Sequence, residues 1–336
     1  MPFSTLIGND RIKTLLRRAV AEGRIGQSLL MAGPRGVGKH QFAVALAQAL
    51  NCEQVERGEA CGDCVPCRKI ARNEHADVRT ILRESQDPSF KKESKSQFIK
   101  VDQTRALSEQ AQFRPYEGRR RVFIIDDAEW LRHEAANSLL KTLEEPPDTS
   151  LIILITAKPF SLLDTIRSRC LMLSFAPLTA AEIEQHLRTT KTSPEEARLR
   201  ARLAVGSIGS AIEINLAEYR EMRTLLVEMI ETLAFSRDSI RLLSAAEYLG
   251  RKLDKDGFEK HLDALMVLLG DLFHLKVCEA TDLLINEDIV ERLARAAEGL
   301  SLEQITEWTD QIELVFQSLP RNVNRQLAME AFLITA

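Results

Sequence analysis

The chain has 336 residues, with 45 basic and 49 acidic side chains, and 45% of its residues are hydrophobic. This length predicts two or three domains, and the composition is that of a folded chain. A net charge of −4 excludes a wholly basic nucleic-acid binder, although not a local basic patch. The sequence contains neither the roughly 18–20 continuous apolar residues of a membrane span nor a secretory signal. We therefore expect a cytoplasmic protein, in which the six cysteines do not form a disulfide framework.

Short apolar runs in the first half predict β-strands. They lie at 28–32, 122–125, 151–156 and 171–175, with a weaker run at 77–82. Uninterrupted apolar runs are typical of strands buried on both faces of a parallel sheet. Helical patterns separate them, and this alternation predicts a doubly wound α/β domain to about residue 178.

The second half is predicted to be helical. There is no proline between Pro194 and Pro320, and apolar residues recur at spacings of three and four. Thr179 with Glu182 forms a capping-box pattern, and the Gly/Ser patch at 205–210 is expected to break the helices. Three regions follow from these signals, at 1–178, 179–212 and 213–336.

The segment GPRGVGKH (33–40) has the pattern and the setting of a phosphate loop, because it follows a predicted strand and opens a predicted helix. Gly33, Gly36 and Gly38 allow the backbone to turn so that its N–H groups face a phosphate. Lys39 would reach the terminal phosphates of a nucleotide. We therefore expect ATP or ADP as a candidate ligand of this loop.

Two positions depart from an ATP-hydrolysing site. His40 stands where Ser or Thr would bind Mg²⁺, and imidazole is a poor ligand for this ion, so efficient Mg²⁺-dependent hydrolysis is not expected. Asp126, at the end of a predicted strand, is the expected Mg²⁺-side carboxylate. Asp127 follows it in place of the usual Glu, and either weakens a general base or simply begins a helix.

Cys52, Cys61, Cys64 and Cys67 are spaced C-x8-C-x2-C-x2-C. Four thiolates so close together predict a closed, structural Zn²⁺ site. An iron–sulfur cluster is the alternative, although the Cys-Pro of the common ferredoxin run is absent. The two remaining cysteines are expected to be single thiols or small buried residues.

Residues 137–170 resemble the AAA+ clamp-loader family of DNA replication. LLKTLEEPP (139–147) and the triplet Ser168-Arg169-Cys170 carry the resemblance, and the cysteine insertion is similar to that of the bacterial subunits. The resemblance covers about residues 1–212. It implies an AAA+ P-loop domain with a five-stranded parallel sheet and a zinc insertion near 52–67, then a small helical lid and an all-α collar for oligomerisation.

The resemblance also implies roles for two residues. Arg169 would reach across a subunit interface to the γ-phosphate of ATP in a neighbour, and Thr156 would be a sensor of that phosphate. The implied partners are the γ/τ and δ subunits, with the sliding clamp and primer-template DNA reached through the complex. His40, Asp127 and the glycine at 209, where the hydrolysing γ/τ subunit carries an arginine, favour the non-hydrolysing stator type, δ′.

Two rival hypotheses remain. An autonomous ATPase of the γ/τ type would hydrolyse ATP with Mg²⁺ as an isolated chain. A zinc DNA-binding module on an ATPase scaffold would use basic residues at 119–121 and 91–92. Base-reading modules present a helix or aromatic side chains to nucleic acid, and 61–67 contains neither signal.

Overall fold

The computed structural model describes residues 1–83, 98–190, 192–236, 238–278, 283–319 and 323–335. The lysine pair at 91–92 lies outside these ranges. The chain forms two compact units. Unit 1 comprises Met1–Ala197 and Ala204–Ile212, and unit 2 comprises Arg198–Leu203 and Glu213–Ala336. The predicted division into three regions stays a prediction. The two units do not separate 179–212 as a region of its own, and they assign Arg198–Leu203 to the C-terminal unit.

Unit 1 contains a five-stranded sheet in the order β2-β3-β4-β1-β5, in which every neighbouring pair is parallel. The strands are β1 (Ser28–Ala32), β2 (Val78–Ile81), β3 (Arg121–Ile125), β4 (Ser150–Thr156) and β5 (Leu171–Ser174). Each predicted run coincides with a strand to within one residue at either end. The predicted parallel α/β sheet is therefore confirmed.

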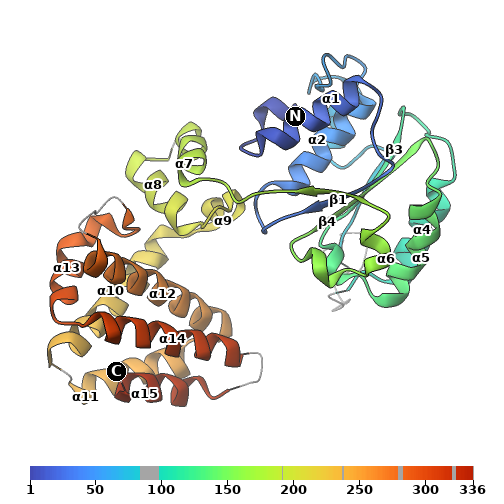
Figure 1. The fold of residues 1–336 in the computed structure, drawn as a ribbon. Coiled ribbons are helices and arrows are strands. Elements are labelled where there is room, and N and C mark those ends of the chain that lie inside the picture. Colours follow the sequence, from blue (N-terminus) through green and yellow to red (C-terminus); the bar gives the residue numbers. More distant parts are fainter. Residues whose placement is uncertain (84–97, 191, 237, 279–282, 320–322, 336) are drawn as a thin grey trace. The chain divides into compact units, whose positions relative to one another are not determined.

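Helices cover both faces of this sheet (Figure 1). Successive side chains of a strand point to opposite faces. Leu29 and Met31 of β1 accordingly pack with helices on one side, and Leu30 packs with those on the other. The first face is covered by α1 (Asp10–Ala21), α2 (Lys39–Asn51) and α3 (Val65–Ala71), and the second by α4 (Val101–Ala111), α5 (His133–Glu144) and α6 (Asp164–Arg167). The central strands β1, β3 and β4 are thus buried on both faces, as their continuous apolar runs predict, whereas the edge strands β2 and β5 are partly exposed.

Short helices follow the sheet. They are α7 (Ala180–Thr189), α8 (Pro194–Leu203) and α9 (Ile208–Glu213). The predicted capping box is confirmed, because Thr179 Oγ1 accepts from the Glu182 N–H and Glu182 accepts from the Thr179 N–H. The predicted break at 205–210 is too long, because α9 begins at Ile208. The turn is made at Val205 and Gly206, which have φ values of 44° and 83°.

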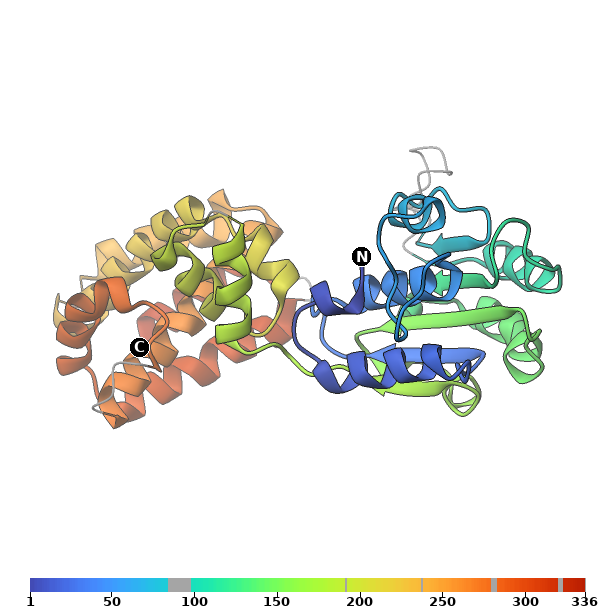
Figure 2. The same ribbon diagram turned by 90° about the horizontal axis from the view of Figure 1, so that it is seen from above.

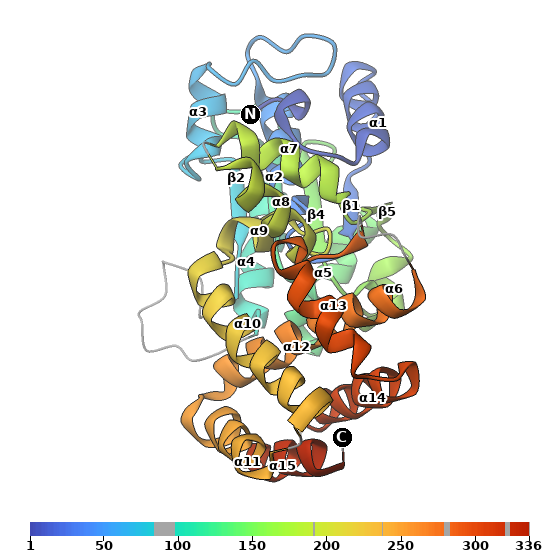
Figure 3. The same ribbon diagram turned by 90° about the vertical axis from the view of Figure 1, so that its left-hand side faces the viewer.

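Unit 2 is helical, as predicted. Its helices are α10 (Leu216–Glu231), α11 (Ser239–Glu247), α12 (Lys255–Val277), α13 (Val290–Glu298), α14 (Leu302–Ser318) and α15 (Arg325–Thr335). Helix α12 packs against α10, α13 and α14 (Figure 3). Trp308 and Phe258 are among the largest side chains of the core that these helices share. Among the described residues, no helix has the length and apolar character required to cross a membrane.

A buried polar network lies inside unit 2. Asp271 accepts from the backbone N–H groups of Ile285 and Asn286 and from the Asn286 side chain. Asn286 Oδ1 accepts in turn from Tyr219 Oη at 2.8 Å and Arg223 Nη1 at 2.9 Å. Each buried polar group of the cluster is paired, so the network joins α10, α12 and the segment before α13 without an unsatisfied charge.

Candidate functional site

The predicted phosphate-binding residues meet at the carboxyl edge of the sheet. Gly33 follows β1, Asp126 follows β3, and Thr156 ends β4. Carboxyl ends of adjacent parallel strands share one edge, which is where open α/β sheets bind ligands. A cavity of about 210 Å³ lies there, and its lining includes Gly36, Gly38, Lys39, His40, Asp126, Asp127 and Thr156.

The loop has the backbone geometry that glycine permits. Gly36 and Gly38 have φ values of 71° and 94°, in the left-handed region. The backbone N–H of Gly209 donates to the Gly36 carbonyl at 3.0 Å, and a Cβ at Gly209 would lie 3.1 Å from Gly36 Cα. Gly209, which stands where the resemblance implies an arginine in the γ/τ subunit, therefore contacts the loop through its backbone and has little room for a side chain.

Lys39 is held by the loop that precedes it. Its ammonium group donates to the carbonyl oxygens of Gly33 at 2.7 Å and Pro34 at 2.6 Å, and the residue is 6% exposed. Burial lowers the pKa of Lys39, while the nearby Asp126 carboxylate opposes that shift. The ammonium would therefore exchange loop carbonyls for phosphate oxygens when an anion binds.

His40 lies against the carboxylate expected to face Mg²⁺. Its Nδ1 is 3.0 Å from Asp126 Oδ2, a close contact that lacks the alignment of a hydrogen bond. Burial raises the pKa of Asp126, but His40 and the Asp127 N–H outweigh it, and the pKa lies below its ordinary value. Mg²⁺ requires near-octahedral oxygen ligands, and this nitrogen–carboxylate pair does not supply them. The residues present do not fit the ion.

Asp127 faces arginines. Its backbone is left-handed (φ 53°), and its carboxylate lies 3.1 Å from Arg83 and 3.8 Å from Arg35. Burial raises its pKa, and Arg83 opposes the shift. Asp127 precedes the 3-10 helix Ala128–Trp130 but makes no side-chain capping hydrogen bond. Sequence reasoning missed both arginines, because Arg35 occupies a variable position of the loop and Arg83 follows β2 without a motif.

Arg169 lies outside the cavity lining. Its Nε donates to Glu144 Oε1 at 2.8 Å, its Nη2 donates to the same oxygen, and its Nη1 donates to the Thr165 carbonyl at 2.9 Å. The side chain is 32% exposed. The structure therefore does not bring Arg169 to the chain's own phosphate loop, and Glu144 is a contact that the sequence analysis did not identify.

The four cysteines of the insertion converge, since their sulfur atoms all lie within 4.8 Å of one another. Cys52 Sγ and Cys64 Sγ are 3.9 Å apart, close to the roughly 3.8 Å edge of a sulfur tetrahedron around zinc. Backbone N–H groups of Gln54 and Cys61 point at Cys52 Sγ. The geometry and donor set fit a four-coordinate thiolate metal site.

The insertion is anchored to α2. Gln48 is fully buried, and its Nε2 donates to the Cys67 carbonyl at 2.7 Å. Its Oε1 accepts from the Met1 ammonium at 2.5 Å, so the start of the chain lies beside α2 (Figure 2). One glutamine thus links a residue of the cysteine cluster to Met1.

The basic run at 119–121 is engaged within unit 1. The N–H groups of Arg119 and Arg120 donate to Asn51 Oδ1, and Arg121 Nη1 donates to the Gln110 carbonyl. Arg121 Nε also lies 3.3 Å from buried Asp77. The backbone of the run and the Arg121 side chain are thus held within unit 1, whereas the Arg119 side chain is exposed, so the zinc DNA-binding hypothesis stays untested.

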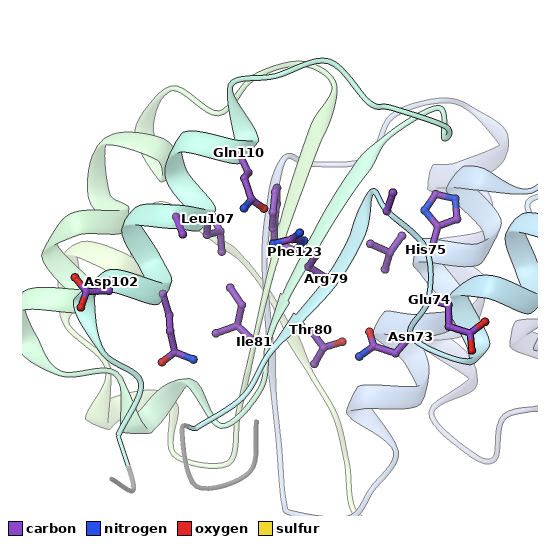
Figure 4. Close-up of a pocket in the computed structure, with 14 residues that line it drawn as sticks. Asn73, Glu74, His75, Arg79, Thr80, Ile81, Asp102, Leu107, Gln110 and Phe123 are labelled. Carbon is purple, nitrogen blue, oxygen red and sulfur yellow. The ribbon is translucent and has the colours of Figure 1, made fainter. Parts of the chain in front are cut away.

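A second groove, of about 620 Å³, lies along the edge strand β2 and helix α4 (Figure 4). Arg79, Thr80 and Ile81 line one part of it, and Leu107 and Gln110 line another. None of the phosphate-loop residues contributes to its lining. The groove is therefore separate from the motif-derived site.

Comparison with known proteins identifies the family. The family described as DNA polymerase III, delta subunit matches residues 8–179, and the family described as its C-terminal part matches 223–336. The chain is 30% identical to "DNA polymerase III subunit delta'" of Bacillus subtilis over 96% of this chain and 94% of that protein. It is 34% identical to subunit tau of Escherichia coli over 63% of this chain but only 32% of tau.

A solved structure of the Bacillus subtilis DNA clamp loader delta protein covers 95% of this chain and 98% of that one, with 14% identity and a TM-score of 0.35. That likeness is too distant to support an argument. The two matching families and the full-length similarity to delta' are sufficient: the chain belongs to the DNA polymerase III delta' family of clamp-loader subunits.

Proposed function

We propose that this chain is the stator subunit, δ′, of a clamp loader, and that it supplies Arg169 to ATP bound by a neighbouring γ/τ subunit without hydrolysing ATP itself. Family membership supports the role in a clamp loader. The contact of His40 Nδ1 with Asp126 Oδ2, 3.0 Å apart, carries the non-hydrolysing part of the proposal.

Loss of hydrolysis follows from the chemistry of phosphoryl transfer. Such sites hold Mg²⁺ between a Ser/Thr hydroxyl and an acidic side chain, and the ion neutralises the developing charge. Here an imidazole replaces the hydroxyl and contacts the acid, while Asp127 pairs with Arg83. Lys39 and the loop glycines retain the means to bind phosphate, so bound ATP or ADP is compatible with the proposal.

A trans-acting role suits Arg169, because a guanidinium neutralises charge developing on a transferring phosphoryl group. It is one-third exposed and outside its own chain's phosphate cavity. The proposed partners are γ/τ and δ, and the complex would open the sliding clamp and load it on primed DNA in the cytoplasm. ATP would favour the clamp-opening state only through its preference for that state.

The cysteine cluster is proposed to hold a structural Zn²⁺ ion. Four protein thiolates would fill a tetrahedral site and leave no position for a reacting water. Cys52, Cys61, Cys64 and Cys67 would then fix the insertion between α2 and β2, outside the chemistry of the nucleotide.

An autonomous ATPase is the second candidate, and the glycine geometry and buried Lys39 favour it. ATP hydrolysis separates the two, measured with the chain alone and in a complex with γ/τ and δ. We expect no turnover alone and activity in the complex that falls in Arg169→Ala. Arg167→Ala is the matched control, because Arg167 pairs with Asp164 on α6. Turnover by the isolated chain, abolished in Lys39→Ala, would overturn the stator proposal.

A further inference from the structure

Glu144 and Thr165 hold one side of the Arg169 guanidinium. Nε and Nη2 of Arg169 both donate to Glu144 Oε1, and Nη1 donates to the Thr165 carbonyl. A guanidinium has five N–H donors in a rigid plane, so these three contacts determine the orientation of the whole group.

The two acceptors stand on fixed elements. Glu144 is the last residue of α5, directly after Leu143, which is 3% exposed. Thr165 lies in α6 directly before Ile166, which is fully buried. Both neighbours belong to the same apolar cluster under the sheet. The acceptors therefore keep their separation, although the carboxylate and guanidinium themselves lie near the surface.

Donors remain for a further anion. Nη2 has a second N–H, and among the described residues the only other contact of Nη1 is a long one, 3.4 Å, to Ser168 Oγ. Arg169 can therefore contact a phosphate through the Nη groups while Glu144 still accepts from Nε. Glu144 therefore holds the Arg169 side chain in place, and Arg169 does not have to release Glu144 in order to contact a phosphate.

We propose that Glu144 is the positioning residue of Arg169, holding the guanidinium in the orientation that a neighbour's phosphate requires before the interface forms. The proposal rests on the proposed function of Arg169. An arginine without this support loses rotamer freedom only at the interface, and misplacement by about 1 Å lowers rates up to roughly a hundredfold. Exposed ion pairs contribute little to folding, so removing Glu144 leaves the fold intact.

The test is steady-state ATP hydrolysis by the complex reconstituted with γ/τ and δ. In Glu144→Ala we expect the Arg169-dependent kcat to fall about tenfold with KM unchanged. Glu144→Gln retains an oxygen that accepts from Nε and Nη2, so it restores most of the rate. Glu145→Ala, which removes the next carboxylate along the chain, is the matched control and leaves the rate unchanged. Assembly is checked by sedimentation.

A rise or no change in kcat for Glu144→Ala overturns the proposal, since a rise is the result expected of a carboxylate that competes with phosphate. Failure of Glu144→Gln to restore the rate also overturns it. Arg169→Ala, alone and combined with Glu144→Ala, distinguishes failure of the proposed function of Arg169 from failure of the positioning role of Glu144. If Arg169→Ala changes nothing, the proposed function fails; if it lowers kcat while Glu144→Ala is silent, only the positioning role fails.

Discussion

His40 Nδ1 and Asp126 Oδ2, 3.0 Å apart, connect the first turn of α2 to the end of β3. An imidazole thus stands beside the carboxylate that would otherwise face Mg²⁺. The phosphate loop retains its glycines and its lysine, so the presence of His40 is expected to affect the binding of Mg²⁺ and not the binding of phosphate. The consequences can be measured on the isolated chain, independently of any complex.

Serine at position 40 restores the hydroxyl that binds Mg²⁺ and frees Asp126. For His40→Ser we expect a fluorescent ATP analogue to bind about tenfold tighter with Mg²⁺ than with EDTA, equivalent to about 1.4 kcal/mol. The wild-type chain binds equally in both, because its donor set does not fit the ion. Gln41→Ser, one residue further along the cavity lining, is the control. Equal affinities for His40→Ser in the two buffers contradict the assignment.

Gly36 supports a close approach between the phosphate loop and the segment after α8. A Cβ at Gly36 would collide with Ser207 Oγ, whereas a Cβ at Gly38 would meet nothing closer than 4.0 Å. Both residues have positive φ, so alanine at either costs about 1–2 kcal/mol of backbone strain. We expect Gly36→Ala to lower the free energy of unfolding more than Gly38→Ala in urea titrations. Equal losses in the free energy of unfolding would mean that Ser207 moves away from the added Cβ without destabilising the fold.

Asp77 is a buried carboxylate that organises the turn before β3. It accepts from the N–H groups of Tyr116, Glu117 and Gly118, and Arg121 lies beside it. Burial raises its pKa, but these donors outweigh burial, and the pKa of folded Asp77 lies below the ordinary value. The folded state therefore binds this proton more weakly than the unfolded state, so the stabilisation is complete above the ordinary pKa. It is lost as the pH falls through the folded value.

For Asp77→Asn we expect a loss of about 1–3 kcal/mol in the free energy of unfolding at neutral pH. The acid limb, followed by circular dichroism below about pH 5, becomes less steep. Asp10→Asn, at an exposed carboxylate, is the control. An unchanged acid limb in Asp77→Asn would show that other carboxylates dominate acid unfolding.

The cysteine cluster predicts one Zn²⁺ per chain by elemental analysis. Cys64→Ser removes one of four thiolates, and we expect most of the metal to be lost, because zinc favours four protein ligands in structural sites. Cys170→Ser and Cys278→Ser keep the metal, since neither belongs to the cluster. Purification with iron in place of zinc would support the iron–sulfur alternative instead.

The sequence predicts those features in which local pattern and tertiary structure agree. The three central strands, β1, β3 and β4, are apolar runs that are almost wholly buried, so their positions follow from the local sequence pattern, and the edge strands β2 and β5 are only partly buried. The cysteine cluster follows from spacing within one short insertion. The error at 205–210 arose because Ile208 begins a helix inside a Gly/Ser patch, where Val205 takes a left-handed conformation that local propensity disfavours.

Features that depend on distant partners could not be predicted. Arg83 and Asp127 are 44 residues apart and meet only because β2 and β3 are neighbours in the sheet. Glu144 ends α5 and Arg169 follows α6, and their hydrogen bond forms because these two helices pack together. The network around Asp271 and Asn286 has no motif, because its members come from α10, α12 and the segment before α13 and meet only in the folded chain.

The residues Arg198–Leu203 at the end of α8 belong to unit 2, whereas the segments on either side of them belong to unit 1. Leu199 packs in the C-terminal core, and Arg198 and Arg202 both pair with Glu287. The backbone therefore passes from one unit to the other three times, at 197/198, 203/204 and 212/213. A single protease cut after Ile212 would leave the N-terminal fragment still carrying six residues of the C-terminal fold. The two pieces should then stay associated as a split protein, and an expression fragment of unit 2 has to begin no later than Arg198 to retain its own core.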